Sequence, residues 1–185
     1  TDIYIPFVHK SIALPIWLYI PFAIFVMLAT TNAINLTDGI DGLSSSVTTI
    51  ILTCLTVLGI IFNIKEVTLF GSTLSGACLG FLLFNLYPAK VIMGDTGSLC
   101  LGGAVAAIAL YLKMPLILII IAIIPILETL SVMLQVAHFK RTGNRIFKMA
   151  PLHHHFELSG WKENKVVSVF SIVTLIACII GIFSI

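Results

Sequence analysis

The chain alternates long apolar stretches with short polar ones, and this pattern predicts its architecture. Six apolar stretches approach the roughly 20 residues that a helix needs to cross a bilayer. They cover residues 12–31, 47–64, 67–86, 98–112, 116–139 and 166–185. None shows the alternation of a membrane β-strand, and a helix satisfies its backbone groups internally. The sequence therefore predicts an all-α, polytopic integral membrane protein, with six transmembrane helices in a single transmembrane helical domain over residues 1–185.

The polar connections between these stretches divide between two faces of the predicted bundle. One face carries loops at about 32–46, 87–97 and 140–165, and the other carries the N-terminal residues and two tight turns. Lysine and arginine are unevenly shared: Lys90, Lys140, Arg141, Arg145, Lys148, Lys162 and Lys165 fall on the first face, and Lys10, Lys65 and Lys113 on the second. Because cytoplasmic loops carry the excess of positive charge, we expect the first face to be cytoplasmic.

Composition supports a membrane location and excludes several other classes. Hydrophobic residues make up 59% of the chain and charged residues only 10%, against about 25% charged in a typical soluble domain. The net charge of +2 is too small to indicate a nucleic-acid partner. The four cysteines lie inside apolar stretches and form no CxxC or Cys/His spacing, so we expect packed thiols rather than a disulfide framework or a zinc site.

The polar segment NAINLTDGIDGL holds two carboxylates, Asp38 and Asp41, each followed by a glycine. A spacing of three residues places both carboxylates on one side if the segment is helical. Glycine allows a tight turn and the close approach of a ligand. A solvated loop with helix caps fits the same spacing equally well.

A third carboxylate, Asp95, stands in the segment MGDTGS just before the fourth apolar stretch. An N-cap would suit this pattern. The alternative is a ligand for a hard cation, because Mg²⁺ binds through one or two carboxylates together with substrate phosphates. Asp38, Asp41 and Asp95 fall on the same predicted face, which favours a site for a polyphosphate and a metal ion.

Three adjacent histidines, His153, His154 and His155, lie in the segment PLHHHFELSGW. Adjacent side chains cannot all point one way, so they suit a single zinc ion poorly. Histidine can donate a hydrogen bond to a phosphate or transfer a proton near neutral pH. The basic run at 138–148 precedes them and either steers an anionic substrate or anchors the cytoplasmic face.

The fifth apolar stretch contains one acid, Glu128, three residues after Pro125. An acid inside an apolar span is a functional hypothesis by default, and the proline predicts a broken helix. Gln135 lies on nearly the same helical face as Glu128. Small residues at 71, 75, 76, 80, 102 and 103 predict close contacts between helices.

Four segments together resemble one known family: NLTDGIDGL, PAKVIMGDTGSL, LETLSVMLQV and PLHHHFELSGW. They are similar to the phospho-N-acetylmuramoyl-pentapeptide transferases, a branch of the polyprenyl-phosphate N-acetylhexosamine-1-phosphate transferases, over essentially the whole chain. The resemblance implies transfer of phospho-N-acetylmuramoyl-pentapeptide from UDP to undecaprenyl phosphate, with Mg²⁺ and release of UMP. It also implies a location in the bacterial cytoplasmic membrane, with the active site on the cytoplasmic face and with contact to membrane lipid. The same resemblance implies that the protein forms a homodimer and binds nucleoside inhibitors.

The family's functional residues carry over onto matching positions of this sequence. The resemblance implies catalytic roles for Asp38, Asp95 and His154, with Asp95 as the metal ligand. It implies substrate-binding roles for a further six residues: Asn35, Asp41, Asn85, Gln135, His153 and His155. It leaves open whether an aspartate deprotonates undecaprenyl phosphate or first forms a covalent phospho-sugar intermediate.

Two features depart from the family pattern. The family has ten spans, and an aspartate pair in its N-terminal half belongs to the site; this sequence contains no Asp-Asp. We therefore expect the chain to correspond to the C-terminal six spans and to be inactive alone. Ile92 stands where the family commonly has phenylalanine and offers an apolar contact to a nucleobase without a π face.

Three other interpretations remain open at this point. A sister transferase would use UDP-N-acetylglucosamine, which turnover of the two sugar nucleotides would reveal. A secondary transporter would use Glu128, Asp38 and Asp41 as coupling acids, although transporter sites lie near the midplane between repeats and this sequence shows no repeat. A structural membrane subunit would have no activity that depends on Asp95.

Overall fold

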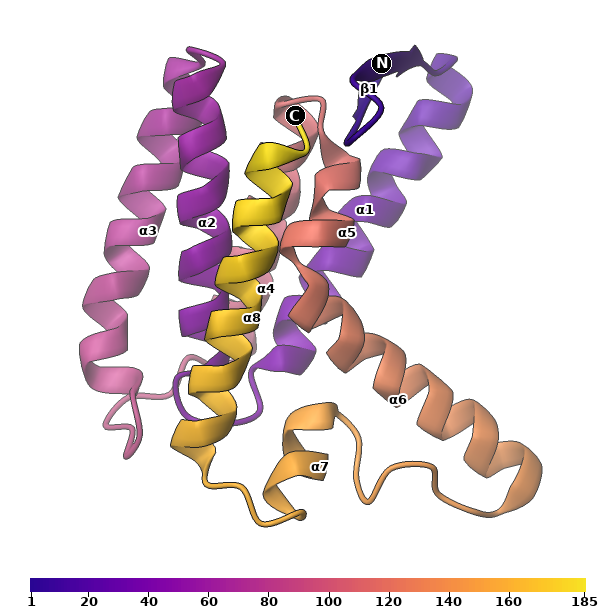
Figure 1. Ribbon diagram of the computed structural model, residues 1–185, viewed down its shortest axis with the longest axis vertical. Helices are drawn as coiled ribbons and strands as arrows, with labels where there is room; N and C mark the ends of the chain where they lie inside the picture. Colours follow the sequence, from indigo (N-terminus) through magenta and orange to yellow (C-terminus); the bar gives the residue numbers. More distant parts are fainter.

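Long helices capped by a small β-hairpin make up the structure, a computed structural model that describes residues 1–185 (Figure 1). In chain order the elements are β1 (Asp2–Ile5), β2 (Lys10–Ala13), α1 (Ile16–Thr37), α2 (Leu43–Ile61), α3 (Lys65–Asn85), α4 (Gly94–Tyr111), the 3-10 helix η1 (Pro115–Ile117), α5 (Leu118–Ile121), α6 (Ile123–Thr142), α7 (Leu152–Glu157) and α8 (Glu163–Phe183). Six helices (α1, α2, α3, α4, α6 and α8) are long and apolar enough to cross a membrane. The predicted all-α, polytopic fold is confirmed.

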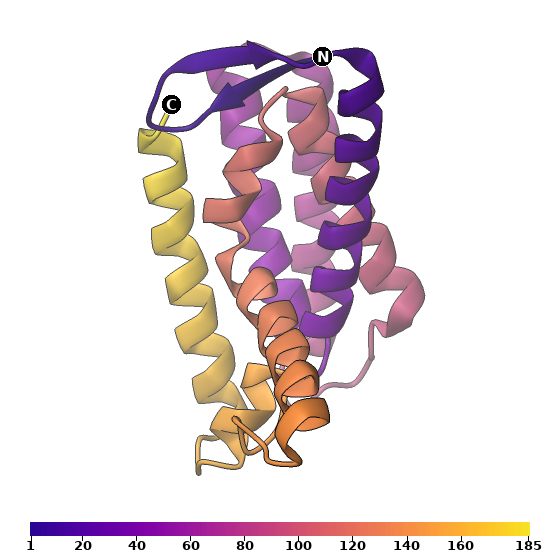
Figure 2. The ribbon, with the colours of Figure 1, turned by 90° about the vertical axis from the view of Figure 1, so that its right-hand side faces the viewer.

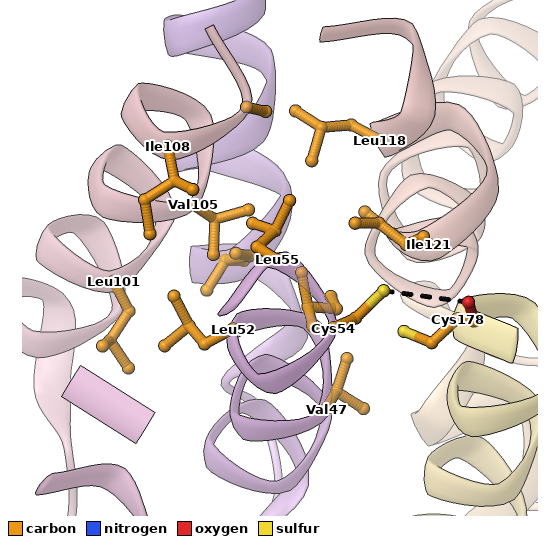
Figure 3. Packing of buried hydrophobic residues seen from close by; sticks show 14 of the residues in the cluster. Val47, Leu52, Cys54, Leu55, Leu101, Val105, Ile108, Leu118, Ile121 and Cys178 are labelled. Atoms are coloured by element: carbon orange, nitrogen blue, oxygen red, sulfur yellow. Dashed lines mark hydrogen bonds between the residues drawn. The ribbon is translucent and has the colours of Figure 1, made fainter. Parts of the chain in front are cut away.

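Helix α2 lies at the centre of the bundle and organises its core. Of the 18 residues in its most apolar stretch, 67% are buried, against 17–39% for the other five long helices. Leu52 and Leu55 are fully buried and pack among side chains of α4, α5 and α8 (Figure 3). The thiol of Cys54 donates to the backbone oxygen of Cys178 across 3.7 Å. Packed thiols were expected, and all four cysteines are free, although Cys100 is exposed.

The β-hairpin lies across one end of the bundle, next to the C-terminus (Figure 2). The strands pair antiparallel. The amide of Tyr4 donates to the carbonyl oxygen of Lys113 at 2.8 Å, and the amide of Phe7 donates to that of Ser184 at 2.7 Å. The loop 38–42, the loop 86–93 and the segment with α7 lie at the opposite end (Figure 1). Polar segments distant in the sequence are therefore gathered at one end of the bundle.

The first helix differs from its predicted bounds of 12–31. It begins after Pro15 and continues to Thr37, so the predicted loop 32–46 shrinks to residues 38–42. The polar residues stay helical because their side chains bond locally: the hydroxyl of Thr37 donates to the carbonyl oxygen of Ala33 at 2.7 Å. Ala33 and Ile34 are also buried against neighbouring helices. Asn35 is consequently a helical residue rather than a loop residue.

The predicted break in the fifth span is confirmed, and it falls at Ala122, just before Pro125. Ala122 has φ −100° and ψ 29°, outside the helical region. The proline then lies in the first turn of α6, where its missing N–H costs little. After the break α6 tilts away from the bundle (Figure 1), and the predicted loop 140–165 contains the additional short helix α7.

Small residues make helix contacts at some predicted positions and not at others. At Gly102 of α4, a Cβ would meet backbone atoms of Thr31 in α1, and at Gly71 of α3 it would meet the hydroxyl of Thr56 in α2. Gly76, Gly80 and Gly103 have no such neighbour within 4 Å. These three positions face away from the rest of the chain, so no helix of this chain contacts them.

Candidate functional site

Helices α1 and α4 bring the first polar cluster together at the end of the bundle opposite the hairpin. The side-chain amide of Asn35, near the end of α1, donates to the Asp95 carboxylate at 3.1 Å and to the Ser98 hydroxyl at 2.9 Å. Asp95 and Ser98 lie in the first turns of α4. Ser98 is fully buried and was not among the predicted site residues. Its place one turn after Asp95, on the same helical face, was the signal available in the sequence.

Asp95 itself is not an N-cap. Met93 occupies the cap position, no side chain caps the helix, and Asp95 lies inside the first turn. The capping interpretation of Asp95 is therefore wrong, and its exposed carboxylate is bonded only by Asn35. A carboxylate in the first turn still gains from the positive end of the helix dipole.

Asp38 follows α1 directly and lies close enough to Asp95 to feel its charge. Desolvation by burial, and secondly the Asp95 charge, raise the pKa of Asp38 to about 6. Two like charges held near one another are the arrangement that a divalent cation would relieve. The site thus holds two neighbouring carboxylates, Asp38 and Asp95, and the Asn35 amide, which links α1 to α4.

Asp41, the third predicted acid, has a different role in the structure. Its carboxylate accepts a hydrogen bond from the backbone amide of Ala89 at 2.9 Å. No set of three or more Asp, Glu, His or Cys side chains is placed to hold a metal ion. The structure therefore brings Asp38 close to Asp95 and gives Asp41 a backbone amide as its partner. Asp38 and Asp95 fit a magnesium ion only if substrate phosphates complete its coordination, which is how Mg²⁺ is commonly held.

Asn85 organises the same loop as Asp41. It is 4% exposed, accepts a hydrogen bond from the hydroxyl of Ser45 and donates to the carbonyl oxygen of Val91 at 3.0 Å. Both polar atoms of its side chain therefore have partners within the chain. Ile92, the residue after Val91, is 80% exposed at the same end of the bundle.

The three histidines point to three different partners. His153 is buried, and its ring packs against Gly39 in the loop after Asp38. His154 is half-buried, with Nδ1 2.7 Å from a carboxylate oxygen of Glu157. Nδ1 of His155 accepts from the backbone amide of Lys148 at 3.1 Å. His153 thus contacts the loop that carries Asp38 and Asp41.

Gln135 holds the segment that follows α6. Its amide oxygen accepts from the backbone amides of Ile146 and Phe147, both at 3.0 Å. Its amide nitrogen donates to the carbonyl oxygen of Phe147 at 3.0 Å. Gln135 also lines a largely apolar hollow of about 420 Å³, which Lys140 and Arg145 border with positive charge. The basic run thus lies beside a cavity large enough for part of a ligand.

Known proteins resemble this chain closely. The family model described as glycosyl transferase family 4 matches residues 1–113. A phospho-N-acetylmuramoyl-pentapeptide-transferase of Clostridium botulinum (strain Eklund 17B) is 59% identical over 181 residues, covering 98% of this chain and 56% of that protein. A protein of the same name from Acetivibrio thermocellus is 54% identical over 187 residues, with 100% and 56% covered.

A third relative of that name, from Clostridium perfringens (strain 13), is 56% identical over 186 residues, covering 100% of this chain and 58% of that protein. The chain therefore spans somewhat more than half of the length of these curated relatives. The family model itself covers more than half of the chain, including both segments that supply Asn35, Asp38 and Asp95. On this evidence the chain belongs to glycosyl transferase family 4.

Proposed function

We propose that the full-length protein containing this chain transfers phospho-N-acetylmuramoyl-pentapeptide from UDP to undecaprenyl phosphate. UMP leaves, and the product is the first lipid-linked peptidoglycan precursor. The observation that carries the proposal is the meeting of Asn35, Asp38 and Asp95 at one end of α1 and α4, in a chain 54–59% identical to proteins with this transferase name. Phosphoryl transfer needs charge neutralisation and positioning more than covalent assistance.

The proposed site faces the cytoplasm. A lipid phosphate is present only at the level of the headgroups, and a nucleotide sugar reaches the membrane from the cytosol. The end of the bundle with Asp38 and Asp95 carries seven of the ten lysine and arginine residues, which favours the cytoplasmic side of a bacterial cytoplasmic membrane. Both substrates can meet at that end.

Within this proposal each polar group has a distinct task. Asp95 and Asp38 would hold Mg²⁺ together with the substrate phosphates, and the metal ion would supply neutralisation of the phosphate charge. Asn35 keeps the Asp95 carboxylate in place through its hydrogen bond. His154 donates to the pyrophosphate while Glu157 fixes its ring through Nδ1. Asp41 and Asn85 support the loop 86–93 that borders the site, and Gln135 and His155 hold the segment 143–150.

The test is UMP release by the full-length protein from UDP-N-acetylmuramoyl-pentapeptide and undecaprenyl phosphate, with and without Mg²⁺. We expect Mg²⁺-dependent release that Asp95→Ala abolishes. Asp2→Ala is the matched control, because Asp2 is a half-buried aspartate in the hairpin at the opposite end of the bundle, where it pairs with Lys113. Absence of release from well-folded wild-type protein would overturn the proposal, and faster turnover of UDP-N-acetylglucosamine would point to the sister transferase instead.

Two further partners follow from the family resemblance. We propose that the full-length protein forms a homodimer and that nucleoside inhibitors compete with the nucleotide sugar. Light scattering in detergent measures the first, with a monomeric mass as the contradicting result. Inhibition of UMP release measures the second, and Ile92→Phe tests whether an aromatic ring at this exposed position strengthens inhibitor binding.

A further inference from the structure

One buried pair of residues joins the broken helix α6 to the short helix α7. Glu128 and His153 are both fully buried. The backbone amide of His153 donates to Oε1 of Glu128 at 3.2 Å, and Nδ1 of the His153 ring lies 3.2 Å from Oε2. The second contact is an ion-pair distance without the alignment of a hydrogen bond. A single carboxylate therefore binds the backbone amide of His153 and also faces its ring.

The other edge of the same ring lies against the loop that carries the predicted catalytic aspartate. A Cβ at Gly39 would overlap Nε2 of His153 and come within 2.7 Å of Cε1. A ring this close to the backbone leaves no room for any side chain at position 39. Three segments far apart in the sequence, α6, α7 and the loop 38–42, thus meet at one imidazole.

We propose that Glu128 and His153 are positioning residues, which clamp α7 and its neighbour His154 against the loop of Asp38. The inference rests on the proposed function for its catalytic meaning, and on the contacts above for its geometry. A buried carboxylate or imidazole that loses its partner keeps its desolvation cost without compensation, so the arrangement holds only while both are present. Partners of this kind typically affect activity 10- to 100-fold without touching the substrate.

The first experiment measures the steady-state kinetics of the full-length protein with Glu128→Gln, Gly39→Ala and both together. Glutamine keeps an oxygen acceptor for the His153 amide but replaces the carboxyl oxygen that faces Nδ1 with an NH2 group. We expect each single change to lower kcat about 10-fold or more while KM for the nucleotide sugar stays nearly unchanged, and to lower the thermal midpoint because a buried contact is disturbed. Because both act through His153, the double variant is expected to fall far short of the product of the two effects. Multiplicative effects, or kcat values like wild type, would overturn the clamp.

The matched controls are Glu66→Gln, an exposed acid in the first turn of α3, and Gly76→Ala, a helical glycine with open space around it. Both are expected to behave as wild type. If Glu128→Gln fails to fold, Glu128→Asp replaces it in the test. Aspartate retains a carboxyl group, and this variant is expected to keep part of the wild-type kcat.

A second readout does not depend on activity. Hydrogen exchange of backbone amides in segments 38–42 and 151–157 is expected to accelerate together in Glu128→Gln and in neither control. Unchanged exchange in either segment would overturn the clamp even in an active enzyme. If the wild-type protein released no UMP, the proposed function would fail while the exchange data still decided whether the clamp exists.

Discussion

The contact between α1 and α4 can be tested at a single glycine. A Cβ at Gly102 would lie 2.6 Å from Cα of Thr31 and 3.1 Å from the carbonyl oxygens of Thr30 and Thr31. These are backbone atoms and cannot rotate away. Ordinary contact begins at 3.4 Å, so Gly102→Ala must separate the two helices by about 1 Å at this point.

The expected cost follows from that displacement. Overpacking of this kind typically costs about 1–3 kcal/mol, which lowers the melting temperature of a domain of this size by roughly 2 to 10 °C. Asn35 lies one turn beyond Thr31, and its bonds of 3.1 Å to Asp95 and 2.9 Å to Ser98 would exceed hydrogen-bond length after such a shift. A misplacement of about 1 Å in a site can cost on the order of 100-fold in rate.

The neighbouring glycine supplies the control. Gly103 belongs to the same helix turn and has no heavy atom near its missing Cβ, so Gly103→Ala should be neutral or slightly stabilising because alanine favours helices. Thermal unfolding in detergent and UMP release by the full-length protein are measured for both variants. Equal melting temperatures and equal rates for the two would refute the claim that backbone contact at Gly102 sets the geometry of the site.

Three further outcomes are expected. The pKa of Asp38, raised to about 6 by burial and by the Asp95 charge, makes the folded form bind a proton more tightly than the unfolded chain. In Mg²⁺-free buffer the free energy of unfolding should therefore rise by about 1–2 kcal/mol, after allowance for solvent screening, as pH falls from about 7 to about 4. Thermal melts should show this, and a profile that is the same in Asp38→Asn would contradict it. A free Mg²⁺ concentration near 100 times the Kd should stabilise the wild type by about 2.7 kcal/mol. An equal stabilisation of Asp95→Asn would show that Asp95 is not a metal ligand. Ser45→Ala leaves the buried oxygen of Asn85 without its donor and should cost about 1–3 kcal/mol in chemical denaturation, and a variant as stable as wild type would count against this.

The sequence predicts the carboxylates well because they are conspicuous. Asp38 and Asp95 are charged residues beside apolar spans in a chain with only 10% charged residues, and a helix end at the membrane surface is where such groups can be solvated. Their proximity follows once the spans are recognised, because α1 and α4 expose those ends on the same face. The structure adds Ser98, whose hydroxyl matters only because α1 packs against α4 at this height.

Residues whose roles depend on distant neighbours could not be predicted in the same way. The family resemblance, rather than any pattern in the sequence, implies substrate contacts for Asn85 and Gln135. In the structure their amides pair with backbone groups of nearby loops, because a loop that crosses the bundle end must satisfy its own donors and acceptors. The β-hairpin escaped prediction for a different reason: strands of four residues carry too little periodicity to be distinguished from a polar lead-in.

The two halves of the proposed chemistry are held by different kinds of contact. Asn35 and Asp95 stand on helices α1 and α4, whose backbones touch at Gly102 and form a rigid frame, and Asp38 directly follows α1. His154 stands on a helix of six residues, too short to be stable alone, and it follows a segment that leaves the bundle with α6. A carboxylate pair that binds a metal ion needs the rigid frame, because ligand distances are fixed within tenths of an ångström. A side chain that binds phosphates, such as His154, needs only to lie next to these helices. The imidazole of His153, which packs on Gly39 and faces Glu128, places α7 there in the proposed clamp. Loss of the buried pair should therefore release the histidines and loosen the loop 38–42, while Asn35 and Asp95 stay in place on α1 and α4.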